Sequence, residues 1–325
     1  MSTTVVNTGT EGKTWGGGNK PLKASYGKLM MWFFITSDAL TFTGFLAAYG
    51  FSRFKYAEIW PIADDVYTHV PFIHGDYPMI FVAFMTFILI MSSVTMVLAV
   101  DAGHKLDKAK TTIYMFLTVI GGLIFLSSQA YEWTTFINGT YGAVGTHGGN
   151  IIQFVDTDGK RVALKDFAIA QPSERVQHQR KNGLWFDGEK ALPSFTLNEV
   201  VAGFEANPDL LIKTTYADEN GHKIILSRNE SLNELKTKGK NVVEGANLIQ
   251  NEYGPPLFAN YFFFITGFHG FHVSIGVLLN IIIFFNVILG TYERRGSYEM
   301  VEKVGLYWHF VDLVWVFVFT FFYLV

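Results

Sequence analysis

The sequence contains no cysteine and few charges. Without cysteine, the 325-residue chain can form no disulfide, no Cys-based metal site and no covalent attachment to a c-type haem. Only 16% of the residues are charged, whereas an ordinary soluble domain carries about a quarter. The net charge of −3 indicates no particular partner, and no nucleic acid is expected.

The N-terminus lacks the apolar core of a secretory signal peptide. Residues 1–26 read "MSTTVVNTGTEGKTWGGGNKPLKASY", which is polar and rich in glycine. We therefore expect a flexible cytoplasmic tail here rather than a cleaved leader.

Long apolar runs are abundant. A helix needs roughly 20 predominantly apolar residues to cross a bilayer. Five runs reach that length, and Asp38 and Asp312 are the only acids within them; the runs are 29–52, 77–100, 111–131, 253–292 and 304–325. The sequence predicts an all-α integral membrane protein with five transmembrane helices, three in 27–137 and two in 256–325.

Lysine and arginine in the short connections predict the orientation, because such residues are enriched on the cytoplasmic side. The loop 53–76 has only Arg53 and Lys55. The opposite side receives Lys13, Lys20, Lys23, Lys28, Lys105, Lys108, Lys110, Arg294, Arg295 and Lys303. The N-terminus is therefore predicted to be cytoplasmic, and the C-terminus and the segment 138–255 periplasmic.

The segment 138–255 is predicted to be an extramembrane α+β insert. The stretches 150–167 and 210–227 each predict two short strands, around an Asp-Gly and an Asn-Gly turn. "TLNE" (196–199) and "SLNE" (231–234) are typical of capping boxes that open short helices.

Ionisable side chains in a membrane are costly, at least ~2.5–3.5 kcal/mol for a charge at mid-span, so they should face the bundle interior, a cavity or a neighbouring subunit. Asp38 is either an acid hydrogen-bonded to a neighbouring helix or part of a proton path or lipid contact. Glu132, at the outer end of the third span, is interpreted as a boundary residue. Asp312 lies one turn from His309 and could hold its tautomer or shuttle protons.

Three histidines raise the question of haem. His269 and His272 are three residues apart and share one face of a helix, so they cannot bind opposite faces of one porphyrin. One of them could pair with His309 in a single-haem cytochrome b. Copper or zinc would need three or four ligands, so no metal site is expected. Contacts with helices, subunits or lipid head groups are favoured, and the row Thr266, Gly270 and Ser274 predicts close helix approach. A transporter is disfavoured, because no inverted repeat or Gly/Pro-broken pair of spans is present.

Several stretches together resemble subunit III of the haem-copper terminal oxidases, the cytochrome c oxidase family. "TGFHGFHVSIG" (266–276) is followed by "YWHFVDLVWVFVF" (307–319). "KLMMWFFITSDALTFTGFLAAY" (28–49), "SSQAYEWTTFI" (127–137) and "LFANYFFFITGFHG" (257–270) are similar to further family segments in the same order. The resemblance covers about 28–137 and 254–325.

The resemblance implies the five-helix form of a V-shaped bundle that holds phospholipid in its cleft. It implies a non-redox subunit of a proton-pumping oxidase in the bacterial inner membrane, with no catalytic residue, haem or metal in this chain. Haem and copper would belong to its partners, subunits I and II. The family also includes quinol-oxidase subunits and a nitric-oxide-reductase-associated protein, so the electron donor stays open.

Roles for particular residues follow from the resemblance and the pattern together. The resemblance implies that Asp38 is the buried acid near proton uptake; Glu132 and Asp312 are further candidates for a proton path. The candidate lipid-binding residues are Lys28, Asp38, His272, His309, Arg294 and Arg295. The candidate helix or subunit contacts are His269, Gly270, Ser274, Trp308 and Trp315.

The insert departs from the family pattern, in which we expect a short outer connection. It adds about 110 residues. We predict that it docks a partner: subunit II, a cytochrome c domain or a neighbouring respiratory complex.

Overall fold

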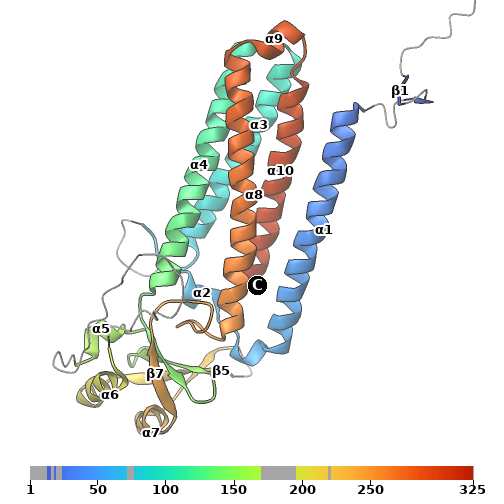
Figure 1. Ribbon diagram of the computed structural model, residues 1–325. Helices are drawn as coiled ribbons and strands as arrows, with labels where there is room; N and C mark the ends of the chain where they lie inside the picture. The colour runs from blue at the N-terminus through green and yellow to red at the C-terminus, as the bar shows by residue number, and fades with distance from the viewer. Residues whose placement is uncertain are drawn as a thin grey trace, which may run out of the picture. The chain divides into compact units, whose positions relative to one another are not determined.

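The computed structural model describes residues 13–15, 18–19, 24–71, 77–169, 195–218 and 221–324. Five of its helices are long and apolar enough to cross a membrane (Figure 1). They are α1 (Tyr26–Lys55), α3 (Ile80–His104), α4 (Lys108–Asn138), α8 (Pro256–Ile288) and α10 (Glu299–Phe319), which continues as the π-helical turn η4 (Thr320–Leu324). The predicted five-span membrane fold is confirmed. The predicted tail, 1–26, lies mostly outside the described residues.

The spanning segments are helical because an apolar layer offers the backbone no hydrogen-bonding solvent, and a helix satisfies its own N–H and C=O groups. Side-chain hydroxyls follow the same rule. Thr36, Thr41 and Thr86 each donate to the carbonyl oxygen four residues earlier, at 2.8–3.1 Å. Large apolar side chains such as Phe51 and Phe54, 78% and 84% exposed, are placed to meet lipid.

The chain divides into two compact units. Unit 1 contains Met1–Phe45, Phe87–Ile124 and Phe271–Phe317. Unit 2 contains Leu46–Thr86, Phe125–Gly270 and Val318–Val325. All five spanning helices contribute to both units, and the predicted boundaries at 27–137, 138–255 and 256–325 stay a prediction.

The core of unit 1 is organised around Trp308 of α10. A Cβ atom on Gly122 of α4 would lie 2.7 Å from its indole ring, and one on Gly276 of α8 would lie 3.0 Å away. The indole Nε1 donates to Ser92 Oγ of α3 at 3.1 Å. Glycine at two positions therefore lets a buried tryptophan bring four helices together. Short α9 (Thr291–Arg295) precedes α10 in the same unit.

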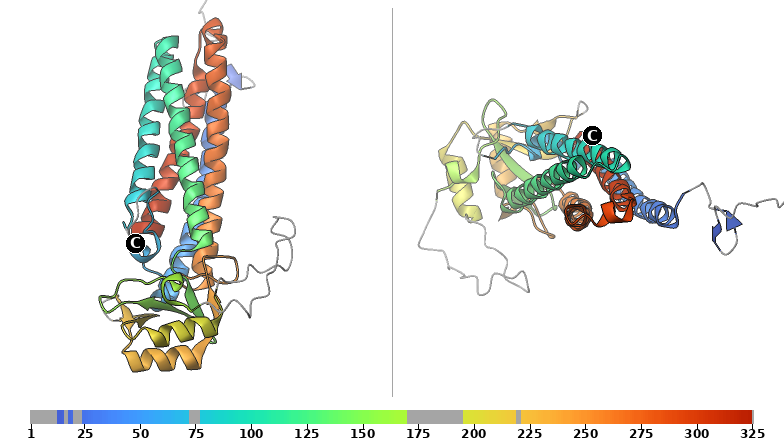
Figure 2. Two further views of the ribbon diagram at one scale, coloured as in Figure 1. Left: turned by 90° about the vertical axis from the view of Figure 1, so that its left-hand side faces the viewer. Right: turned by 90° about the horizontal axis from the view of Figure 1, so that it is seen from above.

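Unit 2 contains an antiparallel five-stranded sheet in the order β6-β5-β4-β3-β7. The strands are β3 (Ala143–Thr146), β4 (Ile151–Val155), β5 (Leu211–Ala217), β6 (Lys223–Ile225) and β7 (Gly239–Val243). The helices α5 (Leu164–Phe167), α6 (Leu197–Ala206) and α7 (Arg228–Lys238) share its apolar core (Figure 2). Central core residues are Phe154, Phe204, Ile212 and Leu235. The predicted α+β insert is confirmed.

The short elements complete the description. The connection after α1 contains η2 (Ala57–Ile59) and α2 (Ala63–Val66), both in unit 2. Near the N-terminus, β1 (Lys13–Trp15) pairs with β2 (Gly18–Asn19).

Two hairpins were predicted in the insert, and only one is present. The predicted strands β5 and β6 are antiparallel neighbours, with Lys213 opposite Ile225. The prediction at the Asp-Gly turn is wrong: only an isolated bridge, Val155 to Arg161, follows it. The next apolar residues form α5 instead, because Leu164 and Phe167 are buried in the core with β4.

The two predicted helix starts also have different outcomes. The capping box of Thr196 and Glu199 opens α6, as predicted. The box at Ser231 is wrong, because α7 begins earlier, after Ser227, whose backbone N–H donates to Glu230 at 3.1 Å. Ser231 is needed elsewhere: it is buried, and its hydroxyl accepts from Ile212 N–H of β5 at 3.1 Å.

The carboxylate of Glu252 closes the insert. It is fully buried and accepts four backbone hydrogen bonds. Three come from the start of the insert, the N–H groups of Thr140, Tyr141 and Gly142, at 3.1–3.2 Å. The fourth comes from Gly245 at its end, at 2.7 Å. One side chain therefore holds the entry and the exit of the insert together.

This closure requires glycine. Gly139 and Gly245 both have positive φ, +73° and +64°. A Cβ on Gly245 would lie 1.9 Å from the carbonyl oxygen of Ile137, and one on Gly139 would lie 2.2 Å from Glu252 Oε2. Only residues without a side chain let the two segments approach this closely.

Basic side chains of the sheet hold the connection between α1 and α3. Lys213 Nζ lies 2.6 Å from Asp65 Oδ2. Lys223 Nζ donates to the carbonyl oxygen of Glu58 at 3.2 Å and to that of Thr215 at 2.6 Å. Burial, reinforced by the charge of Lys213, lowers the pKa of Lys223 to about 8.

Replacing Glu252 with glutamine should destabilise unit 2. Hydrogen bonds to a charged acceptor contribute about 1.5–3 kcal/mol each. The glutamine side chain would also place its NH2 group, a hydrogen-bond donor, against backbone N–H donors. We therefore expect the free energy of unfolding to fall by about 3 kcal/mol or more. This loss of stability is measured as a lower thermal unfolding midpoint and a higher protease sensitivity of the insert. Glu234→Gln, which breaks an exposed ion pair with Lys238, is the control. Equal shifts of the unfolding midpoint in both variants would show that the Glu252 carboxylate contributes no more to stability than the Glu234 carboxylate.

The lowered pKa of Lys223 predicts that the stability of unit 2 depends on pH. Between about pH 8 and the ordinary lysine pKa of about 10.4, the unfolded chain holds a proton on Lys223 that the folded chain has released. Stability should therefore rise with pH across this window. Lys223→Met should flatten the rise in unfolding midpoint, whereas Lys240→Met, at an exposed position on β7, should leave it unchanged. If the unfolding midpoint still rises with pH in Lys223→Met, deprotonation of Lys223 is not the cause of the rise.

Candidate functional site

Asp38 and His272 form an acid–imidazole pair between two spanning helices of unit 1. Asp38 of α1 places Oδ2 3.4 Å from His272 Nε2 of α8. His272 is only 7% exposed, and 20% of the Asp38 side chain is exposed. The sequence put both residues in apolar runs, but it could not predict that they meet.

The surroundings of this pair are aromatic. The ring of Phe42 meets the imidazole of His272 edge-on, with centroids 5.3 Å apart. The hydroxyl of Tyr307 donates to the backbone oxygen of His272 at 3.1 Å. Phe34 of α1 also contacts the Tyr307 ring. The pair therefore sits in low-polarity surroundings, where a net charge is costly.

His309 and Asp312 of α10 both turn to Ser93 of α3. Ser93 Oγ lies 2.9 Å from His309 Nδ1 and is also a hydrogen-bond partner of Asp312. The predicted shared face of His309 and Asp312 is therefore present, and the sequence missed the serine that joins them. Both side chains are half-buried.

His269 has different neighbours from His272, although only three residues separate them. It is fully buried in unit 2, where the Phe125 ring of α4 meets it edge-on with centroids 5.8 Å apart. Trp133 of the same helix donates from its indole Nε1 to Thr266 Oγ1 at 3.0 Å. His269 thus packs against α4, and its predicted role as a helix or subunit contact stays a prediction.

Gly270 is not a tight position within the chain, so the predicted helix or subunit contact of Gly270 and Ser274 stays a prediction. A Cβ on Gly270 would meet nothing within 4 Å, and Ser274 is exposed. The tight positions on α8 are Gly267, against Trp133, and Gly276, against Trp308. Large indole rings, rather than a row of small residues, decide where the helices approach. Both predicted tryptophans, Trp308 and Trp315, are buried.

Charged residues gather at one end of unit 1. Lys28 Nζ lies 2.7 Å from Glu302 Oε2, and His104 Nε2 lies 3.4 Å from the same oxygen. Ser25 hydrogen-bonds Glu299, which also pairs with Lys303 at 3.2 Å. Lys28, His104, Glu299 and Glu302 help line a cavity of about 320 Å³.

The basic pair predicted to bind lipid lies on α9 of the same unit. Arg294 and Arg295 are both exposed there. Lys28, by contrast, already has a carboxylate partner. Of the three basic candidates, the two arginines offer the more accessible charge for a phosphate.

Glu132 is a buried, hydrogen-bonded acid rather than the boundary residue that its position suggested. It is 7% exposed. Tyr323 O–H lies 2.9 Å from its Oε1, and Gln129 Nε2 donates to Oε2 at 2.8 Å. The three-residue spacing of Gln129 and Glu132 on one helix was the available signal for this contact.

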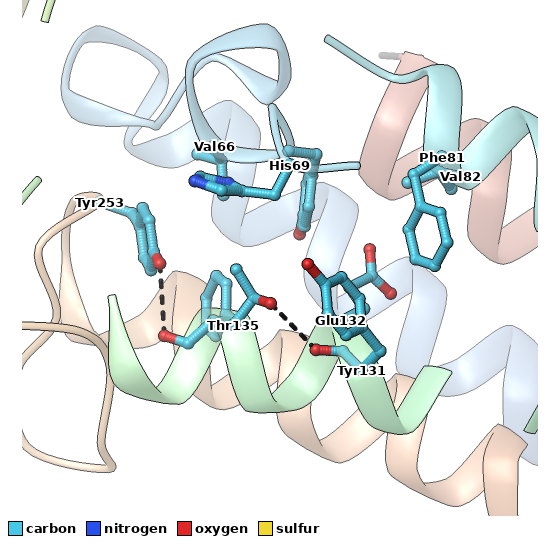
Figure 3. Close-up of a pocket in the computed structure, with 10 residues that line it drawn as sticks. Val66, His69, Phe81, Val82, Tyr131, Glu132, Thr135 and Tyr253 are labelled. Carbon is cyan, nitrogen blue, oxygen red and sulfur yellow. Dashed lines mark hydrogen bonds between the residues drawn. The ribbon is translucent and has the colours of Figure 1, made fainter. Parts of the chain in front are cut away.

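A cavity of about 30 Å³ lies beside Glu132, large enough for one or two water molecules (Figure 3). Tyr67, His69, Tyr131 and Tyr253 help line it. Burial, followed by the charge of Glu132, raises the pKa of Tyr67 well above its usual range. A water here could bridge the polar groups of this pocket.

Chemically, the side chains of these clusters can hold protons and anions. Within the described ranges, no group of three or more His, Asp or Glu side chains is arranged to hold a metal ion. Among the predicted site residues that the structure describes, Asp38 and His272 form an acid–histidine pair across two helices. The other candidates lie in separate clusters.

Comparison with known proteins matches the C-terminal part of the chain. Residues 253–325 match the family model of cytochrome c oxidase subunit III. This match contains α8 and α10, with His269, His272 and His309. The resemblance predicted over 28–137 lies outside it and stays a prediction.

Individual relatives agree. A probable cytochrome c oxidase subunit 3 of Rickettsia conorii is 44% identical over 69 residues, 21% of this chain and 24% of the relative. The subunit 3 of Synechocystis is 44% identical over 68 residues, covering 21% and 29%. That of Thermostichus vulcanus is 42% identical over 76 residues, covering 21% of this chain and 34% of its own length. The chain thus spans about a quarter to a third of the curated relatives it matches. This chain therefore has five helices long and apolar enough to cross a membrane, and over residues 253–325 it is similar to cytochrome c oxidase subunit III.

Proposed function

We propose that the chain acts as the non-redox subunit III of a haem-copper terminal oxidase. In this assignment, oxygen is reduced to water in subunit I, electrons enter through subunit II, and haem and copper belong to those partners. The Asp38–His272 pair carries the proposal, because it joins an acid to an imidazole that lies inside the segment matching the family. The location would be the bacterial inner membrane, with the N-terminus in the cytoplasm.

The pair suits a role in proton uptake. Protonated aspartic acid beside neutral histidine and aspartate beside imidazolium have the same net charge. A proton can therefore move between the two groups without leaving an uncompensated charge in an apolar environment, which is costly. The pair would support proton entry beside subunit I without itself being a redox centre.

Phospholipid is the proposed ligand of this chain. Arg294 and Arg295 present two guanidinium groups, which bind phosphate oxygens in a bidentate manner. Lys28, His272 and His309 remain lipid-contact proposals, although each has a protein partner within 3.4 Å. A V-shaped cleft is the proposed place for the lipid tails.

The electron donor separates this proposal from its near alternatives. A subunit II with a two-copper motif in the purified native complex supports cytochrome c as donor, and its absence supports a quinol oxidase or the nitric-oxide-reductase relative. A Soret band of the isolated chain that disappears on substitution of His309 would instead establish a single-haem cytochrome b.

Asp38→Ala should slow proton uptake or hasten inactivation at high pH, because the imidazole loses the group that shares its proton. Haem spectra of the complex should stay intact. Turnover and proton-uptake rates across pH provide the measurement. Asp101→Asn, an exposed acid of α3 paired with Lys105, is the matched control. Lost haem spectra in the Asp38 variant would contradict a non-redox role.

The insert is proposed to dock a partner on the outer side: subunit II, a cytochrome c domain or a neighbouring respiratory complex. Because the two ends of the insert lie side by side, most of it can be removed and the ends rejoined. Ala143 and Val243 are opposite each other in the pair β3–β7. Replacing 144–242 with a two-residue Asn-Gly turn should therefore join the strands without disturbing Glu252.

This shortened chain should still assemble its helices, with the haem content of the complex unchanged. Partner retention on purification and turnover with the native donor should both fall. Unchanged assembly and unchanged turnover would remove the docking proposal while leaving the family assignment intact.

A further inference from the structure

The turn between β7 and α8 exposes two large aliphatic side chains. Leu248 and Ile249, in "ANLIQN" (246–251), are 72% and 70% exposed. They exceed every other exposed large hydrophobic side chain described in the insert, the next being Tyr216 at 47%.

The turn is held in a defined conformation. Asn247 Oδ1 accepts from the N–H groups of Ile249 and Gln250, at 2.8 and 2.9 Å. Asn247 N–H donates to the carbonyl oxygen of Gln250 at 3.0 Å. The side chain of Gln250 is in turn bound by Asn241 of β7 at 2.9 Å. These bonds use only backbone groups and the side chains of Asn247, Gln250 and Asn241, so the side chains of Leu248 and Ile249 are left exposed.

The residue types are unusual for such a position. Tight turns favour Gly, Pro, Asn, Asp and Ser, each for a conformational or hydrogen-bonding reason. Leucine and isoleucine supply neither reason, and exposing them to water is unfavourable. Their presence at the centre of a fixed turn indicates an apolar medium that covers them.

The turn is attached directly to the ends of two spanning helices in unit 2. Ala246 N–H donates to the carbonyl oxygen of Ile137, one residue from the end of α4, at 3.2 Å. Asn251 Nδ2 donates to the carbonyl oxygen of Pro255, immediately before α8, at 3.1 Å. Figure 1 shows the segment from β7 to α8 beside these helix ends. The turn therefore lies at the level where α4 and α8 leave the apolar layer.

We propose that Leu248 and Ile249 insert into the interfacial region of the lipid bilayer and anchor the insert on the membrane surface. The lipid is the occupant because the turn is hydrogen-bonded to the ends of α4 and α8, two helices long and apolar enough to cross a membrane, and because Asn247 and Gln250 flank the pair with polar groups suited to the head-group level. The anchor fixes the orientation of the sheet at the membrane. This inference does not depend on the electron donor or on proton uptake.

The absence of cysteine makes a direct test available. Single substitutions Leu248→Cys and Ile249→Cys provide unique sites for a nitroxide spin label in the full-length chain. The labelled chains are reconstituted into phosphatidylcholine–phosphatidylglycerol vesicles. Collision rates are then measured with oxygen, which partitions into lipid, and with a water-soluble nickel complex. Leu278→Cys, at an exposed position on α8, gives the lipid reference, and Lys240→Cys on β7 gives the aqueous reference.

Labels at 248 and 249 should shift from the aqueous reference toward the lipid reference, with raised oxygen and lowered nickel collisions. Transfer to detergent-free membrane-scaffold discs of the same lipids should preserve that shift. Values equal to those at Lys240→Cys would place the turn in water and overturn the proposal. Shielding from both reagents would mean coverage by protein, which also overturns it. Unchanged elution and helical content show that each labelled chain is folded.

Discussion

The carboxylate of Glu252 is the contact on which the architecture depends. It binds backbone N–H groups from both ends of the insert, so about 110 residues leave the bundle and return to the same place. The connection between α4 and α8 is therefore short in space although it is long in sequence. The family match begins at residue 253, directly after this carboxylate. A module can be added at such a point because the helices on either side need not move.

Polar side chains inside the apolar segments need hydrogen-bonding or ionic partners, and pairs of side chains from different positions supply them. Asp38 meets His272, His309 meets Ser93, and Glu132 meets Tyr323 and Gln129. Each pairing joins polar groups whose isolation in an apolar layer would be costly. The three histidines thus have three kinds of surroundings, and this explains why two of them on one helix face act separately. Proton-holding pairs and exposed arginines are consistent with the proposed support of an oxidase from beside its redox centres.

Sequence patterns predicted some elements well and others poorly. The five spans, the strand pair β5–β6 and the capping box at Thr196 are local features, set by residues near one another in the chain, and all are present. The second strand at the Asp-Gly turn was wrong because Leu164 and Phe167 gain more by burial against β4. The small-residue row did not indicate which glycines of α8 are tight within the chain, because the positions of Trp133 and Trp308 decide this. Glu252 was missed entirely, since nothing local distinguishes it from the other acids of the insert.

The sequence by itself determined that the chain is membrane-embedded and helical, because run length and the backbone's need for internal hydrogen bonds leave few alternatives. It also determined which polar residues required a partner. Only the tertiary structure decided what those partners are. Asp38 and His272 are far apart in the chain, and Glu252 is 112 positions from Thr140 and 110 from Gly142. Such contacts depend on helix rotation and strand register, which are set by packing across the whole unit and not by neighbouring residues.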